Sequence, residues 1–280
     1  MSSTHRSFPV IAGIDFTSRP NARKPITVAL GAVAQGVVHV ERIDEHHAFA
    51  QFAAWLAAPG RWLGAFDFPF GLPRELVRSL AWPAQWLPLM RHYAGLPRAQ
   101  IRDCFAAFCD ARPAGRKFAH RACDGPAGSS PSMKWVNPPV AWMMHAGVPL
   151  LIDAGVHLPG LHAGDADRVA VEGYPGMLAR ELIGARSYKA DDRARQTPQR
   201  RQARGDLLDA LATGHTRLGL SLRLGDVQHA ALLADATGDR LDAVLCLLQA
   251  AWAAGQPGHG LPADVDPIEG WIVSAPATPR

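Results

Sequence analysis

The sequence predicts an α/β protein whose mixed sheet is flanked by helices. Three strand-like runs come first, at residues 10–16, 26–34 and 37–43. A helix-like run at 46–58 and a fourth strand at 62–68 follow, and polar or glycine-containing turns separate the runs. Clusters of turn residues between apolar runs are typical of strand connections. We therefore expect the order β-β-β-α-β at the start of the chain.

Local patterns support each of these opening elements. In the third run Val38 and Val40 alternate with polar residues, as in a half-buried strand. The helix-like run carries its large apolar residues on one face, and Pro59 and Gly60 end it. This order of strands and helix is the opening of a ribonuclease H-like fold.

The pattern loosens between residues 74 and 165, where prolines recur. Short helices are expected at 74–80, 98–110 and 139–146, around a loop of glycine, serine and proline at 124–132. A segment this long with little regular structure is usually functional or disordered. We interpret residues 74–165 as a large insertion, mostly helix and loop, that forms a lid over the site.

Regular patterns return after the insertion. Residues 168–172 predict another strand, and Pro175 suits the first turn of a helix that continues to Ile183. A polar helical stretch is expected at 191–211. Apolar residues at helical spacing predict a last, strong helix at 240–254.

The size and composition of the chain fit one elaborated domain. Its 280 residues, 48% of them hydrophobic, suffice for a sizeable core. We interpret residues 8–255 as a single ribonuclease H-like domain and 256–280 as a loosely packed tail, in which 271–273 are expected to add a short strand. The sequence has no apolar run of about 18 residues and no signal-peptide pattern, so we expect an unexported, cytoplasmic protein without a membrane span.

Basic residues are concentrated between residues 189 and 204, in a chain with a formal net charge of +4. A basic face of this kind can bind the phosphate groups of nucleic acid. A solvated helix surface is the alternative interpretation. We therefore expect nucleic acid as a partner. Residues of a catalytic or binding site are needed to support this expectation.

Acidic residues at predicted strand ends are the best indication of chemistry. Asp15, Asp67 and Glu172 each lie among apolar neighbours. Burying a carboxylate costs several kcal/mol unless it is paired, protonated or bound to a metal. Asp239 and Asp242 begin the last predicted helix and share one of its faces. If the strand ends converge, these acids form a cage for a hard divalent cation.

Each acid also has a structural interpretation. Asp15 and Asp67 precede turns that an aspartate can cap. Asp239 and Asp242 can stabilise the N-terminal end of a helix. The order of the acids along the chain, from first strand to fourth strand to later strand to last helix, favours the catalytic interpretation.

Four short segments resemble a known family. They are residues 13–16 (Gly-Ile-Asp-Phe), 66–73 (Phe-Asp-Phe-Pro-Phe-Gly-Leu-Pro), 171–175 (Val-Glu-Gly-Tyr-Pro) and 239–243 (Asp-Arg-Leu-Asp-Ala). In collinear order they look like blocks of the domain-of-unknown-function 429 family, which is described as predicted nucleases of the ribonuclease H-like superfamily. The last segment also resembles the end of Holliday-junction resolvases of that superfamily.

The resemblance implies phosphodiester hydrolysis with two metal ions. Asp15 and Asp67 would hold a pair of magnesium or manganese ions, and Asp242, Asp239 or Glu172 would complete the ligand shell. Hard cations of this kind prefer carboxylate oxygens. Two ions can activate the attacking water and stabilise the leaving oxygen.

Three basic residues are candidates for binding the substrate. Lys134 and Lys189 are expected to neutralise charge on the transition state. Arg121 lies in the segment 117–124, which resembles a family stretch with Arg and Asp at these positions. The resemblance implies that this segment contacts substrate.

Two other functional interpretations stay open. Actin-like and sugar-kinase phosphotransferases share the β-β-β-α-β core, and their first hairpin, here at 15–24, binds phosphate. Alternatively the acids are structural, and the chain is an inactive module that binds nucleic acid or protein, because a fold does not establish an activity. The choice between DNA, RNA and a small phosphodiester is equally open.

Four residues have a spacing that suits structural zinc: Cys104, Cys109, His120 and Cys123. The first two cysteines also lie at helical spacing beside Phe105 and Phe108. A buried apolar helix face is the simpler account of these two. Few and irregular cysteines further predict reduced thiols.

Overall fold

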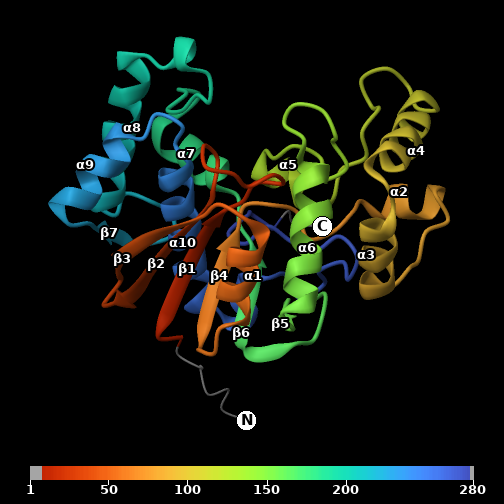
Figure 1. Ribbon diagram of the computed structural model, residues 1–280, viewed down its shortest axis with the longest axis horizontal. Coiled ribbons are helices and arrows are strands. Elements are labelled where there is room, and N and C mark those ends of the chain that lie inside the picture. Colours follow the sequence, from red (N-terminus) through yellow and green to blue (C-terminus); the bar gives the residue numbers. More distant parts are fainter. Residues whose placement is uncertain (1–7, 278–280) are drawn as a thin grey trace.

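The computed structural model describes residues 8–277 and contains a seven-stranded mixed sheet (Figure 1). The strands are β1 (Val10–Asp15), β2 (Ile26–Ala34), β3 (Val37–His46), β4 (Trp62–Phe66), β5 (Val156–His157), β6 (Asp165–Glu172) and β7 (Ser221–Arg223). Their order across the sheet is β5-β6-β4-β1-β2-β3-β7. β1, β2 and β3 are antiparallel neighbours, whereas β4 runs parallel to β1 and β6 runs parallel to β4. The predicted α/β class with a mixed sheet is confirmed.

Helices cover both faces of this sheet. They are α1 (Phe49–Ala57), α2 (Arg74–Ser79), α3 (Trp86–Gly95), α4 (Arg98–Asp110), α5 (Asp124–Ala127), α6 (Val140–Asp153), α7 (Pro175–Ile183), α8 (Pro198–Ala212), α9 (Asp226–Ala234) and α10 (Asp239–Ala254), with 3-10 turns at Arg193–Arg195 and Pro257–Gly260. In Figure 1, α1 and α6 lie in front of the strands and α10 lies behind them. No helix among residues 8–277 is both long and apolar enough to span a membrane.

Alternation along the strands divides the core into two parts. Ala12 and Ile14 of β1 pack with Phe52 of α1 on one face. Ile11 of β1 and Ala65 of β4 pack on the other face with α10. Side chains along a strand point alternately to its two faces, so odd-numbered positions at the ends of β1 and β4 face α10.

The insertion at 74–165 is more helical than the sequence indicates. α3 was not expected, and α6 continues to Asp153 instead of ending near residue 146. The expected end lies just before Gly147, which is a packing residue, because a Cβ atom there would approach the Phe68 ring to 2.7 Å. β7 and α9 were not expected either, while the polar stretch becomes α8 only from Pro198, where Thr197 caps the helix.

Part of the expected loose tail is well packed. Ile268, Ile272 and Val273 are at most 2% exposed. The Val273 amide donates a hydrogen bond to the Glu172 carbonyl at 2.8 Å. Residues 271–273 contribute a single parallel bridge between Ile272 and Glu172 to the sheet edge, in place of a full strand.

Candidate metal centre

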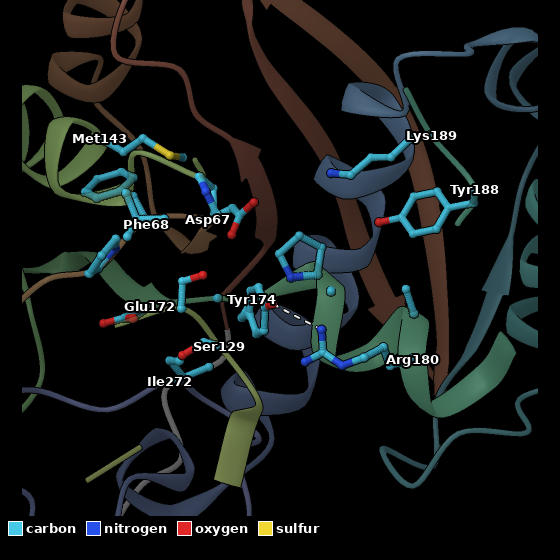
Figure 2. A pocket seen from close by; sticks show the side chains of 18 of the residues that line it. Asp67, Phe68, Ser129, Met143, Glu172, Tyr174, Arg180, Tyr188, Lys189 and Ile272 are labelled. Atoms are coloured by element: carbon cyan, nitrogen blue, oxygen red, sulfur yellow. Dashed lines mark hydrogen bonds between the residues drawn. The ribbon is translucent and has the colours of Figure 1, made fainter. Parts of the chain in front are cut away.

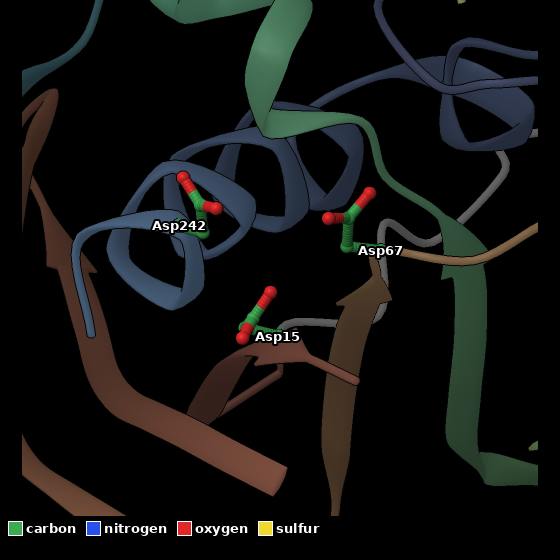
Figure 3. Close-up of side chains that lie close together, drawn as sticks. All are labelled: Asp15, Asp67 and Asp242. Carbon is green, nitrogen blue, oxygen red and sulfur yellow. The ribbon is translucent and has the colours of Figure 1, made fainter. Parts of the chain in front are cut away.

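Three carboxylates converge at one edge of the sheet, as Figure 3 shows. Asp15 ends β1, Asp67 follows β4 by one residue, and Asp242 lies in the first turn of α10. One oxygen of each side chain lies within 4.8 Å of the corresponding oxygens of the other two. Asp15 and Asp242 are 8% and 0% exposed, and Asp67 is half-buried. We call these three residues the aspartate triad.

Strand register brings Asp15 and Asp67 together. β1 and β4 are parallel neighbours in which Ile14 pairs with Phe66, so the next residue of each chain segment, Asp15 or Asp67, lies at the same end of the sheet. The Asp67 amide donates a hydrogen bond to the Ile14 carbonyl at 2.9 Å. Both aspartates therefore point to the face that α10 covers.

Gly13 allows α10 to lie directly on β1. A Cβ atom at this position would lie 2.0 Å from the Ala243 carbonyl oxygen and 2.1 Å from the Leu247 amide nitrogen. Such distances are impossible for any side chain, so only glycine permits this close approach. The contact places Asp242, one residue before Ala243, above Asp15.

Burial and crowding raise the pKa values of these acids. Burial raises the pKa of Asp15 well above its usual value, and the charges of Asp239 and Asp242 raise it further. Burial, followed by the Asp242 charge, raises the pKa of Asp67 to about 7. Burial also raises the pKa of Asp239 to about 6, against the opposing charge of Lys24. The ionised acids are thus short of positive charge, which a proton or a metal ion can supply.

Hydrogen bonds reach only one member of the triad. Tyr188 donates its hydroxyl proton to Asp242 Oδ1, and Lys189 donates from Nζ to Asp242 Oδ2. Within residues 8–277 no hydrogen bond is donated to the side-chain oxygens of Asp15 or Asp67. Free carboxylate oxygens are what a hard cation requires as ligands. The triad can therefore hold a metal ion.

Asp239 lies close to the triad but outside it. Its side chain is 12% exposed and faces Lys24, whose Nζ lies 4.0 Å from Asp239 Oδ1. Of the neighbouring carboxylates, Asp239 has the largest effect on the pKa of Asp15. The structure thus joins three of the four expected aspartate ligands into one group and places the fourth beside it.

Glu172, which we expected to contribute to the metal shell, points to the opposite face of the sheet. It pairs with Phe66 across β4 and β6, so its side chain lies on the Phe66 side and not on the Asp67 side. Arg121 donates to both Glu172 oxygens, at 2.6 and 2.7 Å, and the Phe70 amide donates at 3.0 Å. Glu172 is therefore ion-paired with Arg121 and lies outside the triad, although it lines the same pocket as Asp67.

The other expected basic residues differ in their positions. Lys189 reaches the triad, as described. Arg121 is 3% exposed and hydrogen-bonded to Asp124 and Glu172, so its guanidinium is engaged in a buried ion pair. Lys134 takes part in backbone hydrogen bonds with Pro131 and Ala141 and does not line the pocket beside the triad.

A pocket of about 380 Å³ opens beside the triad (Figure 2). Asp67, Tyr188 and Lys189 belong to its lining and so connect it with the acids. Tyr174 and Arg180 also line it. Tyr174 belongs to the segment 171–175 that resembles a known family, but neither residue was predicted to be part of the site. A tyrosine before a helix and an arginine within it are too common to mark a site without the fold.

The residues proposed for zinc do not form a ligand group. Among residues 8–277 the aspartate triad is the one cluster of metal-binding side chains. Cys104 and Cys109 belong to the core around α4, Cys123 lies in a different cluster, and His120 is exposed. The simpler account, a buried apolar helix face, agrees with the position of the first two.

Comparisons of the chain with protein-family models, with curated proteins and with solved structures find no match. The geometry of the site is therefore the basis for a functional proposal. That geometry comprises a buried triad of carboxylates, two of them without hydrogen-bonded partners, beside a pocket.

Proposed function

We propose that this chain is a metal-dependent nuclease that hydrolyses phosphodiester bonds with Mg²⁺ or Mn²⁺ held by Asp15, Asp67 and Asp242. The observation that carries the proposal is the convergence of three carboxylates within 4.8 Å at a site poor in positive charge. The strand order β6-β4-β1-β2-β3, antiparallel at β1 to β3 and parallel beyond, supports a ribonuclease H-like arrangement. The resemblance to the domain-of-unknown-function 429 family supports the same conclusion.

The donor set suits the proposed cations, because Mg²⁺ and Mn²⁺ prefer carboxylate oxygens to nitrogen or sulfur. We propose a pair of ions, with Asp239 as an additional ligand next to Asp15. Bound ions of this kind would polarise the phosphate and lower the pKa of water, which is the chemistry that hydrolysis needs.

The remaining residues of the site have supporting roles in this proposal. Lys189 lies where the triad meets the pocket, and its side chain is 42% exposed. Its ammonium group can contact a phosphate oxygen and stabilise the charge that develops there. Tyr188 donates a hydrogen bond that orients Asp242.

A cleavage assay tests the proposal. Purified protein is incubated with labelled single-stranded, double-stranded and branched DNA and RNA, in Mg²⁺, Mn²⁺ or EDTA. We expect cleavage that requires metal and disappears in Asp15→Asn. Asp209→Asn is the matched control, because it makes the same change at an exposed position of α8.

Other outcomes would contradict the proposal in different ways. Cleavage that persists in EDTA or in Asp15→Asn would exclude the triad as its source. Binding of nucleic acid without cleavage under any metal would favour an inactive binding module. Thermal stabilisation by ATP, which is the probe for a phosphotransferase, would favour that class instead.

A further inference from the structure

The pocket beside the triad has two chemically different walls. The apolar residues of its lining include Phe68, Val140 and Met143. The lining also includes the cations Arg180, Lys189 and Arg186, of which Arg186 is paired with Asp206, and the acids Asp67 and Glu172. In Figure 2, Phe68 and Met143 lie on one side of the pocket, Lys189 and Arg180 lie on the other, and Tyr174 lies between them. Such a pocket suits a ligand that is flat and apolar at one end and anionic at the other.

Tyr174 is held in place by its neighbours. Its hydroxyl accepts a hydrogen bond from Arg180 Nη1 at 3.1 Å, and the Arg180 guanidinium carbon lies 5.2 Å from the ring centroid. Its amide donates to Gln249 Oε1 at 2.8 Å. A ring fixed in this way keeps its position when a ligand enters, so it can serve as a preformed stacking surface.

The charge of Arg180 is not cancelled by its hydrogen-bonded partners. Besides the Tyr174 hydroxyl, these are the carbonyl oxygens of Ala127 at 2.8 Å and Gly128 at 3.0 Å. All three are neutral groups. Arg180 therefore contributes positive charge to the pocket while it fixes the aromatic ring.

We propose that this pocket receives one unpaired nucleobase of the strand whose phosphate meets the triad, an inference that rests on the proposed nuclease function. Asp67 belongs to both the triad and the pocket lining, so a phosphate at the triad places the adjoining nucleoside at the pocket entrance. Bases stack on aromatic rings and near arginine irrespective of sequence. The volume of about 380 Å³ lies at the lower end of ligand pockets and is large enough for one base.

Binding measurements with matched duplexes test this inference. Fluorescence anisotropy compares a duplex with one bulged nucleotide, the same duplex with an abasic bulge, and the perfect duplex. Ca²⁺ replaces Mg²⁺ to suppress cleavage, and DNA and RNA versions are both used. We expect the bulged base to bind about tenfold more tightly than the abasic bulge. Equal affinities in both DNA and RNA would overturn the inference.

Two tryptophan substitutions test whether the preference for a bulged base arises in this pocket. Met143→Trp fills the pocket and is expected to abolish the tenfold preference. Val227→Trp, at an 84% exposed position of α9, is the control and should retain it. If circular dichroism shows that Met143→Trp is misfolded, Val140→Trp takes its place. A filled pocket that keeps the preference would show that the base binds elsewhere.

The same duplexes separate this inference from the proposed function. Replacing Ca²⁺ with Mg²⁺ or Mn²⁺ adds cleavage as a second readout. Preference for the bulged base without cleavage would support the pocket and contradict the nuclease. Metal-dependent cleavage without that preference would do the reverse.

Discussion

Two groups of buried acids lie at the same edge of the sheet, on its opposite faces. The aspartate triad faces α10, whereas Asp124 and Glu172 lie on the other side with Arg121 between them. Every carboxylate oxygen of Asp124 and Glu172 accepts a hydrogen bond from Arg121 or the backbone. In the triad only Asp242 has such partners. Buried acids whose charges the protein leaves without partners, as at Asp15 and Asp67, are candidates for binding a metal ion.

The largest effect on stability is expected at the ion-paired group of Arg121, Asp124 and Glu172. Arg121→Met would leave Asp124 and Glu172 buried without their cation. Removing one partner of a buried ion pair lowers the free energy of unfolding by about 3–5 kcal/mol. Urea unfolding followed by circular dichroism measures this loss. The control is Arg102→Met, whose ion pair with Asp103 is exposed and contributes at most about 1 kcal/mol. Losses of equal size would mean that the buried network has no special importance.

The next largest effect is expected from metal binding, which should stabilise the protein through the aspartate triad and not through Glu172. Mn²⁺ at about 100 times its Kd is expected to raise the free energy of unfolding by about 2.7 kcal/mol, because it binds only the folded chain. Asp67→Asn should lose most of this stabilisation, whereas Glu172→Gln should keep it. Thermal melting of each variant with and without Mn²⁺ gives the comparison. An equal loss in both variants would place Glu172 in the metal shell.

The local parts of this fold could be predicted from sequence, and the non-local parts could not. The five opening elements follow from periodicity and turn residues near each segment. β7 has three residues and exists because it pairs with β3, far away in the chain. α3 contains Pro88 near its start, which breaks the pattern that indicates a helix.

The candidate site shows the same division. Asp15, Asp67 and Asp242 could be predicted because each acid follows or begins a recognisable element. Glu172 also ends an apolar strand, and the sequence left it as one of three candidates to complete the ligand shell. Its separation from the triad depends on the register of β4 and β6, and its neutralisation depends on Arg121, 51 positions earlier in the chain. Neither relation can be deduced from the residues around Glu172.

The stability of the metal-free protein should depend on pH because Asp67 is partly buried and, among residues 8–277, has no positively charged partner. The pKa of Asp67 is about 7 in the folded protein and about 3.9 in an unfolded chain. Between these values the folded state binds more protons, so metal-free stability falls as pH rises towards 7, by at most about 1.4 kcal/mol per pH unit for this group. Chemical unfolding in EDTA from pH 5 to 8 measures the slope. A slope that is unchanged in Asp67→Asn would assign it to other groups.

The smallest expected effect is a change in the free energy of unfolding that is positive for Asp67→Asn and negative for Glu172→Gln. In EDTA at pH 8, Asp67→Asn removes one of several mutually repelling charges and is expected to raise the free energy of unfolding by about 1 kcal/mol. Glu172→Gln should lower it by at least that amount, because the substitution removes a charge that Arg121 and the Phe70 amide hold. With saturating Mn²⁺ the sign for Asp67→Asn should reverse, since the variant then loses a ligand. Urea unfolding in EDTA and in Mn²⁺ measures both changes. If Asp67→Asn were less stable than the parent protein in EDTA, the Asp67 carboxylate would stabilise the fold without a metal ion, which would contradict its role as a metal ligand.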